Sequence, residues 1–209
     1  MTPRDPAVAN NPCPFLRALA EEGAISKTRE SLDRVAAVVT DVVNDPPKAT
    51  QIRKAVYAIA LVGNGLSPSQ LLHNVRLGLR VSELRGGPLD KLGAGSRILD
   101  AHGEVVAAEL DRLDGFAGDF VDAATGLIER GFGTEHLRKM MDANFERSGA
   151  RRRIDRKLMD GEWPILLRVM GKASTTEPYL SLAEVRTLYV DQRLPARVVE
   201  RITAQRRRS

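Results

Sequence analysis

The stretch at residues 11–23 reads NPCPFLRALAEEG and contains the only cysteine of the chain, Cys13, between two prolines. Pro14 falls at the first position of a helical pattern, where its missing N–H costs nothing. Apolar residues then recur at helical spacing, and Gly23 supplies a stop at the C-terminal end. The stretch therefore predicts a short helix with Cys13 as its N-cap.

The predicted N-cap position determines the chemistry expected of the Cys13 thiol. Its sulfur would face unpaired backbone N–H groups and the positive end of the helix dipole. This environment lowers the pKa of a thiol and favours the thiolate. Such a thiolate can serve as a nucleophile, a redox thiol or a metal ligand. The alternative is an inert cysteine packed as a small hydrophobe.

The same stretch resembles a known family. Pro12-Cys13-Pro14, followed by Leu16, Leu19-Ala20 and Gly23, is similar to the N-terminal signature of the heme-thiolate haloperoxidases and unspecific peroxygenases. In that family the cysteine between the prolines is the proximal ligand of the heme iron. The resemblance implies that Cys13 binds iron and that Pro12, Pro14 and Leu16 belong to the heme-binding segment. Thiolate donation favours O–O cleavage of bound peroxide.

Peroxide activation on heme also needs a base that moves a proton between the two peroxide oxygens. The family uses a glutamate on a helix, helped by a histidine or an arginine. Glu162 is the best candidate, because it enters the apolar run at residues 163–167. Desolvation there would raise its affinity for a proton. The alternative is a first-turn glutamate that only benefits from the helix dipole.

The three histidines are the other candidates for proton transfer. His73 lies beside an apolar helix face, where it would line a heme pocket, whereas His102 and His136 lie in a loop and near a helix start. No pair has the i, i+4 spacing of a zinc site. The sequence favours His73 as the second catalytic candidate, and the alternative is an exposed or hydrogen-bonded histidine.

The resemblance does not extend to a second signature of the family. That signature is an acidic residue, a glycine or histidine, an aspartate and a nearby serine, which hold magnesium beside a heme propionate. Residues 85–90, RGGPLD, stand roughly where it is expected and do not match. The resemblance therefore implies heme without identifying magnesium ligands.

Composition indicates a globular chain. Hydrophobic residues make up 43% of the 209 residues, and one cysteine excludes an internal disulfide. Residues 1–6 have no apolar stretch suited to a signal peptide, and the most apolar run, 55–66, is too short for a bilayer. We therefore expect a cytoplasmic protein with no transmembrane segment.

The net charge of +5 is concentrated in arginine clusters at 151–157 and 206–208. Either cluster can touch nucleic acid or an acidic lipid surface. The alternative is a solvated helix face and a frayed tail. Aromatic residues make up only 4% of the chain, and no helix-turn-helix signature is present, so the sequence argues against nucleic-acid binding.

The hydrophobic periodicity is helical almost throughout, and no strand pattern of useful length is evident. The sequence therefore predicts an all-α fold, a single compact multi-helix domain over 1–209. Flexible tails are expected at 1–10 and 204–209, and a Gly-rich loop at 85–97. After the first helix, further helices are expected at 32–43, 49–62, 68–79, 105–114, 116–130, 134–147, 152–170, 182–191 and 195–206. Capping boxes begin at Ser67 and Ser181.

Two stretches hint at degenerate EF-hand-like helix–loop–helix units. Residues 98–109 and 176–184 both place an apolar residue and then a glutamate at the EF-hand spacing. The first has Ile98 and His102 at its first and fifth ligand positions and so lacks two acidic oxygens, and the second lacks the early aspartates that bind calcium. They are therefore interpreted as a scaffold of paired loops without a working calcium site.

These patterns support two functions. The first is a heme-thiolate oxidoreductase that uses peroxide to oxidise, oxygenate or halogenate a small organic substrate. The alternative is a non-catalytic helical interaction or scaffold protein with degenerate EF-hand-like loops. A cysteine-based redox enzyme without heme ranks below both, because the chain has no resolving cysteine and no convincing base beside Cys13.

Overall fold

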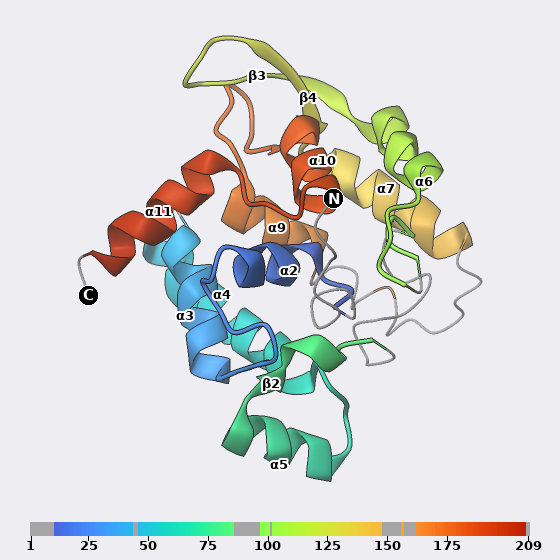
Figure 1. The fold of residues 1–209 in the computed structure, drawn as a ribbon. Helices are drawn as coiled ribbons and strands as arrows, with labels where there is room; N and C mark the ends of the chain where they lie inside the picture. The colour runs from blue at the N-terminus through green and yellow to red at the C-terminus, as the bar shows by residue number, and fades with distance from the viewer. Residues whose placement is uncertain are drawn as a thin grey trace.

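The computed structural model describes residues 11–43, 46–85, 97–100, 102–147, 156 and 162–207 (Figure 1). Its helices are α2 (Pro14–Glu21), α3 (Leu32–Val42), α4 (Pro46–Val62), α5 (Pro68–Leu77), α6 (Ala107–Asp111), α7 (Thr134–Arg147), α9 (Trp163–Met170), α10 (Leu182–Val190) and α11 (Ala196–Arg206). Its strands are β1 (Arg29–Glu30), β2 (Leu79–Arg80), β3 (Gly118–Val121), β4 (Ile128–Phe132) and β5 (Leu180–Ser181). Two 3₁₀ turns, η1 (Val81–Glu83) and η2 (Arg112–Phe116), complete the described elements.

The fold is mixed α/β, so the prediction of an all-α fold is wrong. Strands β1 and β2 pair antiparallel, and β3, β4 and β5 form a second antiparallel sheet in that order. In the second sheet Val121 pairs with Ile128 and Gly118 with Gly131. The expected helix at 116–130 is therefore a β-hairpin.

The hairpin forms because its local sequence favours a turn over a helix. Asp122 Oδ1 accepts hydrogen bonds from the N–H groups of Ala124 (2.7 Å) and Thr125 (3.2 Å). Gly126 follows with φ at +71°, a conformation that only glycine adopts without strain. An aspartate that bonds the backbone two residues on is typical of a turn. The helix was expected from apolar periodicity, which does not indicate a turn of this kind.

The two expected EF-hand-like units do not form, and this part of the fold prediction is also wrong. At 98–109, Leu99 and Val105 make an antiparallel bridge, and Asp100 Oδ1 accepts the N–H groups of His102 and Glu104. At 176–184 the chain enters β5 instead of a loop between helices. The Asp100 carboxylate therefore accepts hydrogen bonds from backbone N–H groups, whereas a calcium loop would need it as a ligand.

Most of the other helices are where the periodicity predicts them. Helices α3, α7, α10 and α11 match closely, and Ser67 caps α5 by accepting a hydrogen bond from the Gln70 N–H (3.3 Å). Ser181 makes no side-chain cap, and the Glu184 side chain pairs with Arg197, so the expected capping box does not form. Of the expected helix 152–170, α9 covers 163–170, and Arg156 alone is described before Glu162.

The predicted tails and loop are only partly described. The expected N-terminal tail and residues 86–96 of the Gly-rich loop lie outside the described residues. The expected C-terminal tail overlaps the last turn of α11, which runs to Arg206. None of the described helices combines the length and the apolar character needed to cross a membrane.

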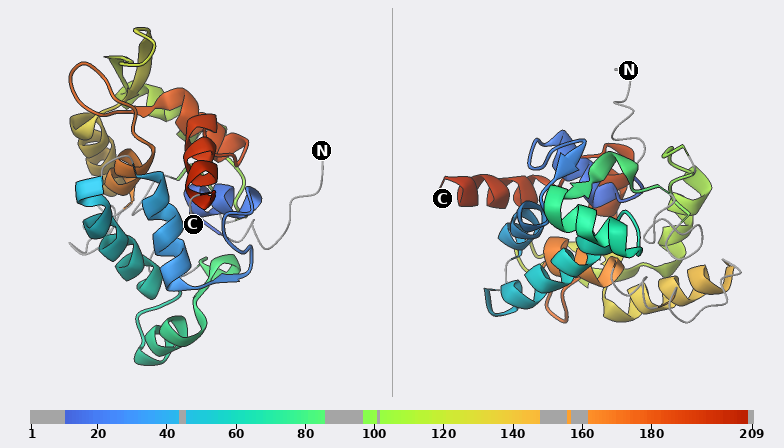
Figure 2. Two further views of the ribbon diagram at one scale, coloured as in Figure 1. Left: turned by 90° about the vertical axis from the view of Figure 1, so that its left-hand side faces the viewer. Right: turned by 90° about the horizontal axis from the view of Figure 1, so that it is seen from below.

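Helix α2 lies in the middle of the molecule, with α3 and α4 on one side and α9 and α10 nearby (Figures 1 and 2). Phe15, Ala18 and Leu19 are buried on it. Helix α2 packs against α10, while α3 packs against α4, α9 and α11. The first helix therefore carries its N-terminal end into the core.

Candidate functional site

Cys13 is the N-cap of α2, as the sequence predicts. Its backbone is extended, with φ −86° and ψ 109°, and Pro14 occupies the first helical turn. The Cys13 N–H donates to Asn11 Oδ1 (2.9 Å), and the Cys13 carbonyl accepts the Arg17 N–H (3.0 Å). These bonds fix the backbone on both sides of the thiol.

Burial dominates the chemistry of this thiol. It raises the pKa of Cys13 from 9.0 to about 11, although the N–H groups of Leu16 and Phe15 and the charge of Arg17 act to lower it. The prediction of a lowered thiol pKa is therefore wrong for the protein without a bound group. Desolvation by the surrounding core outweighs the helix N-terminus. The thiol is protonated at neutral pH unless a cation binds it.

Glu162 interacts electrostatically with this thiol. It is the N-cap of α9, and its carboxylate is a further cause of the raised pKa of Cys13. Burial raises the pKa of Glu162 itself from 4.5 to about 7, as the apolar run after it predicts. The fold therefore brings together two of the residues singled out in the sequence, at the N-terminal ends of α2 and α9.

One side of α2 retains accessible surface beside this pair. Pro12, Cys13 and Leu16 are partly exposed, while Pro14 and Arg17 are buried. Cys13 and Leu16 are three residues apart and so share a face of the helix. Three of the four residues expected to bind a cofactor thus lie on this partly exposed side.

Three further polar groups at this position were missed by the sequence interpretation. Asn11 and Trp163 are completely buried, and Asn11 Nδ2 and Trp163 Nε1 have no hydrogen-bond partner among the described residues. Arg17 is 1% exposed, and its guanidinium donates to the Gly103 carbonyl (3.0 Å). Buried polar atoms without partners are rare, and each one calls for a ligand or water.

The sequence contained a signal for one of these groups only. Arg17 stands four residues after Cys13, so both fall on adjoining turns of one helix face. The burial of Asn11 and Trp163 depends on how α2 and α9 pack, which no local pattern records.

The structure does not bring His73 to this site. His73 lies on α5 and its Nε2 is 3.0 Å from a guanidinium nitrogen of Arg29. Helix α5 is at one end of the molecule, away from the centrally placed α2 (Figure 1). His136 packs edge-on against Phe120, with ring centroids 5.4 Å apart, and the His102 N–H donates to Asp100 Oδ1 (2.8 Å).

Among the described residues, no group of three or more histidine, cysteine, aspartate and glutamate side chains is arranged to hold a metal ion. No family model, curated protein or solved structure matches the chain significantly. The functional argument therefore depends on the Cys13–Glu162 site and on the resemblance of the segment that contains Cys13.

Proposed function

We propose that the protein is a heme-thiolate oxidoreductase that uses peroxide to oxidise, oxygenate or halogenate a small organic substrate. The observation that carries the proposal is that the Cys13 thiol and the Glu162 carboxyl, at the N-terminal ends of α2 and α9, are both desolvated and interact electrostatically. A soft ligand and a proton-transfer group are the two protein groups that this chemistry needs.

The residues around Cys13 fit an iron–thiolate ligand. The Leu16 and Phe15 amides and the buried Arg17 charge all favour a negative sulfur and act against the burial of that charge. Binding of a metal ion releases the thiol proton, so the raised pKa of the free protein is compatible with a bound thiolate. The unpartnered Asn11 Nδ2 and Trp163 Nε1 also suit a site that a ligand completes.

In this proposal Cys13 holds the iron, and the partly exposed Pro12 and Leu16 contact the cofactor, with Pro14 fixing the first turn of α2. Heme supplies, when bound, an iron centre at which the thiolate favours O–O cleavage of peroxide. The amides and Arg17 limit the negative charge on the sulfur.

Glu162 supplies the proton transfer. A carboxyl group with a pKa of about 7 is both a competent acceptor and a competent donor near neutral pH. Its position at the start of α9 fixes the carboxyl against the apolar residues that follow. His73 has no role in this proposal, because Arg29 binds it away from Cys13.

The test is an absorption spectrum of protein expressed with added heme precursor, reduced under carbon monoxide. A strongly red-shifted Soret band is expected for the wild type, and Cys13→Ser should abolish that band while the protein stays folded. Leu127→Gln, a change of an exposed residue on the β3–β4 hairpin, is the matched control and should keep the band. A folded wild-type protein with no Soret band would overturn the proposal.

Glu162→Gln separates heme binding from catalysis. The variant should keep the red-shifted band, and its kcat with peroxide should fall about 10²-fold or more. Glu200→Gln changes an exposed glutamate of α11 in the same way and should leave kcat unchanged. Undiminished turnover in Glu162→Gln would show that Glu162 does not take part in catalysis. The heme proposal would then depend on Cys13 alone.

A further inference from the structure

Helix α5 presents its apolar side chains to solvent. Leu72, Val75 and Leu77 are 50%, 57% and 55% exposed, and Leu66, just before the helix, is 65% exposed. The buried residue of the helix is polar, Asn74. A surface helix normally has the opposite arrangement, with its apolar stripe toward the core.

Polar contacts hold this helix to the rest of the protein. Asn74 Nδ2 donates to the Leu61 carbonyl (2.8 Å), and His73 contacts Arg29 (3.0 Å). At the first turn, Gln70 Oε1 accepts from the Arg80 guanidinium (3.1 Å). The position of α5 is therefore fixed without burying Leu72, Val75 and Leu77, which remain available to a partner.

The charged residues of the segment that contains α4 and α5 have a single sign. Residues 46–82 contain no aspartate or glutamate, although the chain has 27 of them, and they include Lys48, Arg53, Lys54, Arg76 and Arg80. Arg53 pairs with Asp33 (3.6 Å) and Arg80 with Glu83 (2.5 Å), both outside this segment. Lys54 and Arg76 are exposed and form no ion pair with a described residue.

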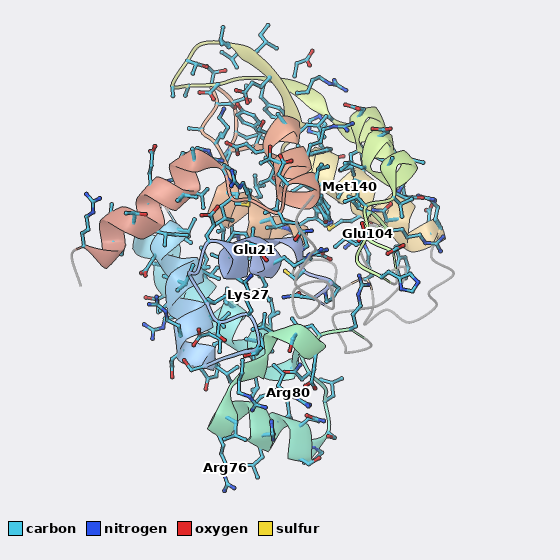
Figure 3. All side chains as sticks on the ribbon, viewed as in Figure 1. Glu21, Lys27, Arg76, Arg80, Glu104 and Met140 are labelled. Carbon is cyan, nitrogen blue, oxygen red and sulfur yellow. The ribbon has the colours of Figure 1, made fainter. Side chains whose placement is uncertain are left out.

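The position of α5 makes this surface accessible to a flat partner. The helix forms one tip of the molecule in two views at right angles (Figures 1 and 2), and Arg76 lies at the outer end of that tip (Figure 3). A projecting tip can touch a plane without a collision of the remaining elements.

We propose that α5 docks on the surface of a bilayer that contains anionic lipids. Leu66, Leu72, Val75 and Leu77 enter the interface, and Arg76 meets the anionic headgroups. Exposed leucine and valine beside cations are typical of interfacial helices. Nucleic acid fits less well, since bases stack on aromatic side chains and α5 has only His73, which binds Arg29. This proposal is independent of heme.

Flotation with lipid vesicles tests the proposal. The wild-type protein should float with vesicles of phosphatidylcholine mixed with phosphatidylglycerol, and binding to phosphatidylcholine alone should be weaker. Leu72→Gln with Val75→Gln should lower the partition coefficient about tenfold or more, and Arg76→Glu should lower binding to the mixed vesicles only. Added salt should weaken the wild-type interaction.

The control is a pair of equally exposed apolar residues elsewhere. Leu127 and Ile128 on the β3–β4 hairpin are 65% and 72% exposed, so Leu127→Gln with Ile128→Gln should leave flotation unchanged. Wild-type protein that stays in the dense fraction, or an equal loss in the hairpin control, would overturn the proposal. A wild-type dimer in sedimentation that Leu72→Gln with Val75→Gln dissociates would instead identify a second copy as the occupant.

Discussion

Glu162 opposes ionisation of Cys13. The two residues are the N-caps of α9 and α2, and the negative charge of the Glu162 carboxylate adds to burial in raising the pKa of the Cys13 thiol. Two acids so placed resist losing both protons, since the second negative charge forms near the first in a desolvated position. A cation between or beside them would relieve both.

Replacing Glu162 with glutamine should lower the pKa of Cys13. Above pH 7 the carboxyl is charged, so its removal shifts the thiol from about 11 toward its ordinary 9.0. The rate of iodoacetamide alkylation against pH reports only on Cys13, because the chain has one cysteine. Glu200→Gln should leave the midpoint where it is. A midpoint that stays or rises in Glu162→Gln would show that the two groups are not coupled.

The raised pKa of Glu162 also makes the stability of the protein without heme depend on pH. The folded state prefers the protonated carboxyl, so its contribution is complete below pH 4.5 and is lost as the pH rises to about 7. A rise from 4.5 to about 7 corresponds to about 3 kcal/mol at most. Urea unfolding should therefore show a loss of stability between these pH values in the wild type.

Glu162→Gln serves as the comparison in this titration. The amide does not ionise, so the variant should lose about 3 kcal/mol less than the wild type over the same pH range. Parallel pH curves for the two proteins would mean that Glu162 is solvated in the folded state.

The position of Cys13 could be predicted because its causes are local. Two prolines, an apolar spacing and a terminal glycine lie within a single stretch, and they specify where α2 begins. The raised pKa of Glu162 was predictable for a similar reason, since the apolar run that desolvates it follows directly. Neither inference required knowledge of the tertiary fold.

The failed predictions depend on contacts between distant segments. The sign of the thiol pKa shift depends on burial and on Glu162, which is far from Cys13 in the sequence. The hairpin at 118–132 is a partial exception, because its Asp122 turn is local, whereas its pairing with β5 joins distant segments. In the sequence His73 lies beside an apolar helix face, but in the fold it is bound by Arg29 of β1. Hydrophobic periodicity identifies the apolar face of a helix, but it does not identify the residues that pack on that face.

Asp122 should contribute strongly to the stability of the hairpin. It is 2% exposed, forms an ion pair with Lys172, and accepts the Ala124 and Thr125 N–H groups. Its hydrogen bond with Lys172, and then the amides, lower its pKa from 3.8 to about 2. Asp122→Asn leaves the mostly buried Lys172 ammonium with Glu129 alone, and should lower the free energy of unfolding by about 3 kcal/mol.

Asp119→Asn is the matched control on the same hairpin. Its side chain is 65% exposed and pairs with Arg130, so its loss should cost less than about 1 kcal/mol in urea unfolding. The stabilisation by Asp122 is complete above pH 3.8 and is lost as the pH falls toward 2. Over this range the wild type should lose more stability than Asp122→Asn, in which only the other carboxyls with lowered pKa values contribute. Equal costs for the two variants would refute the assigned role.

Gly131 permits the close approach of β4 and β5. A Cβ added there would lie 2.5 Å from the Leu180 carbonyl oxygen and 2.6 Å from the Tyr179 ring. The carbonyl belongs to a paired strand and Tyr179 is fully buried, so neither can move aside easily. Gly131→Ala should therefore lower the free energy of unfolding by about 2–3 kcal/mol.

The comparison for Gly131→Ala is Gly115→Ala in η2, where an added Cβ meets nothing within 4 Å. Since alanine also restricts the unfolded chain, this variant should match the wild type or exceed its stability by up to about 1 kcal/mol. Thermal unfolding of both variants measures the difference directly. If Gly131→Ala unfolds at the same temperature as Gly115→Ala, the β4–β5 pairing is looser than described. In that case β5 would not hold the hairpin against α10.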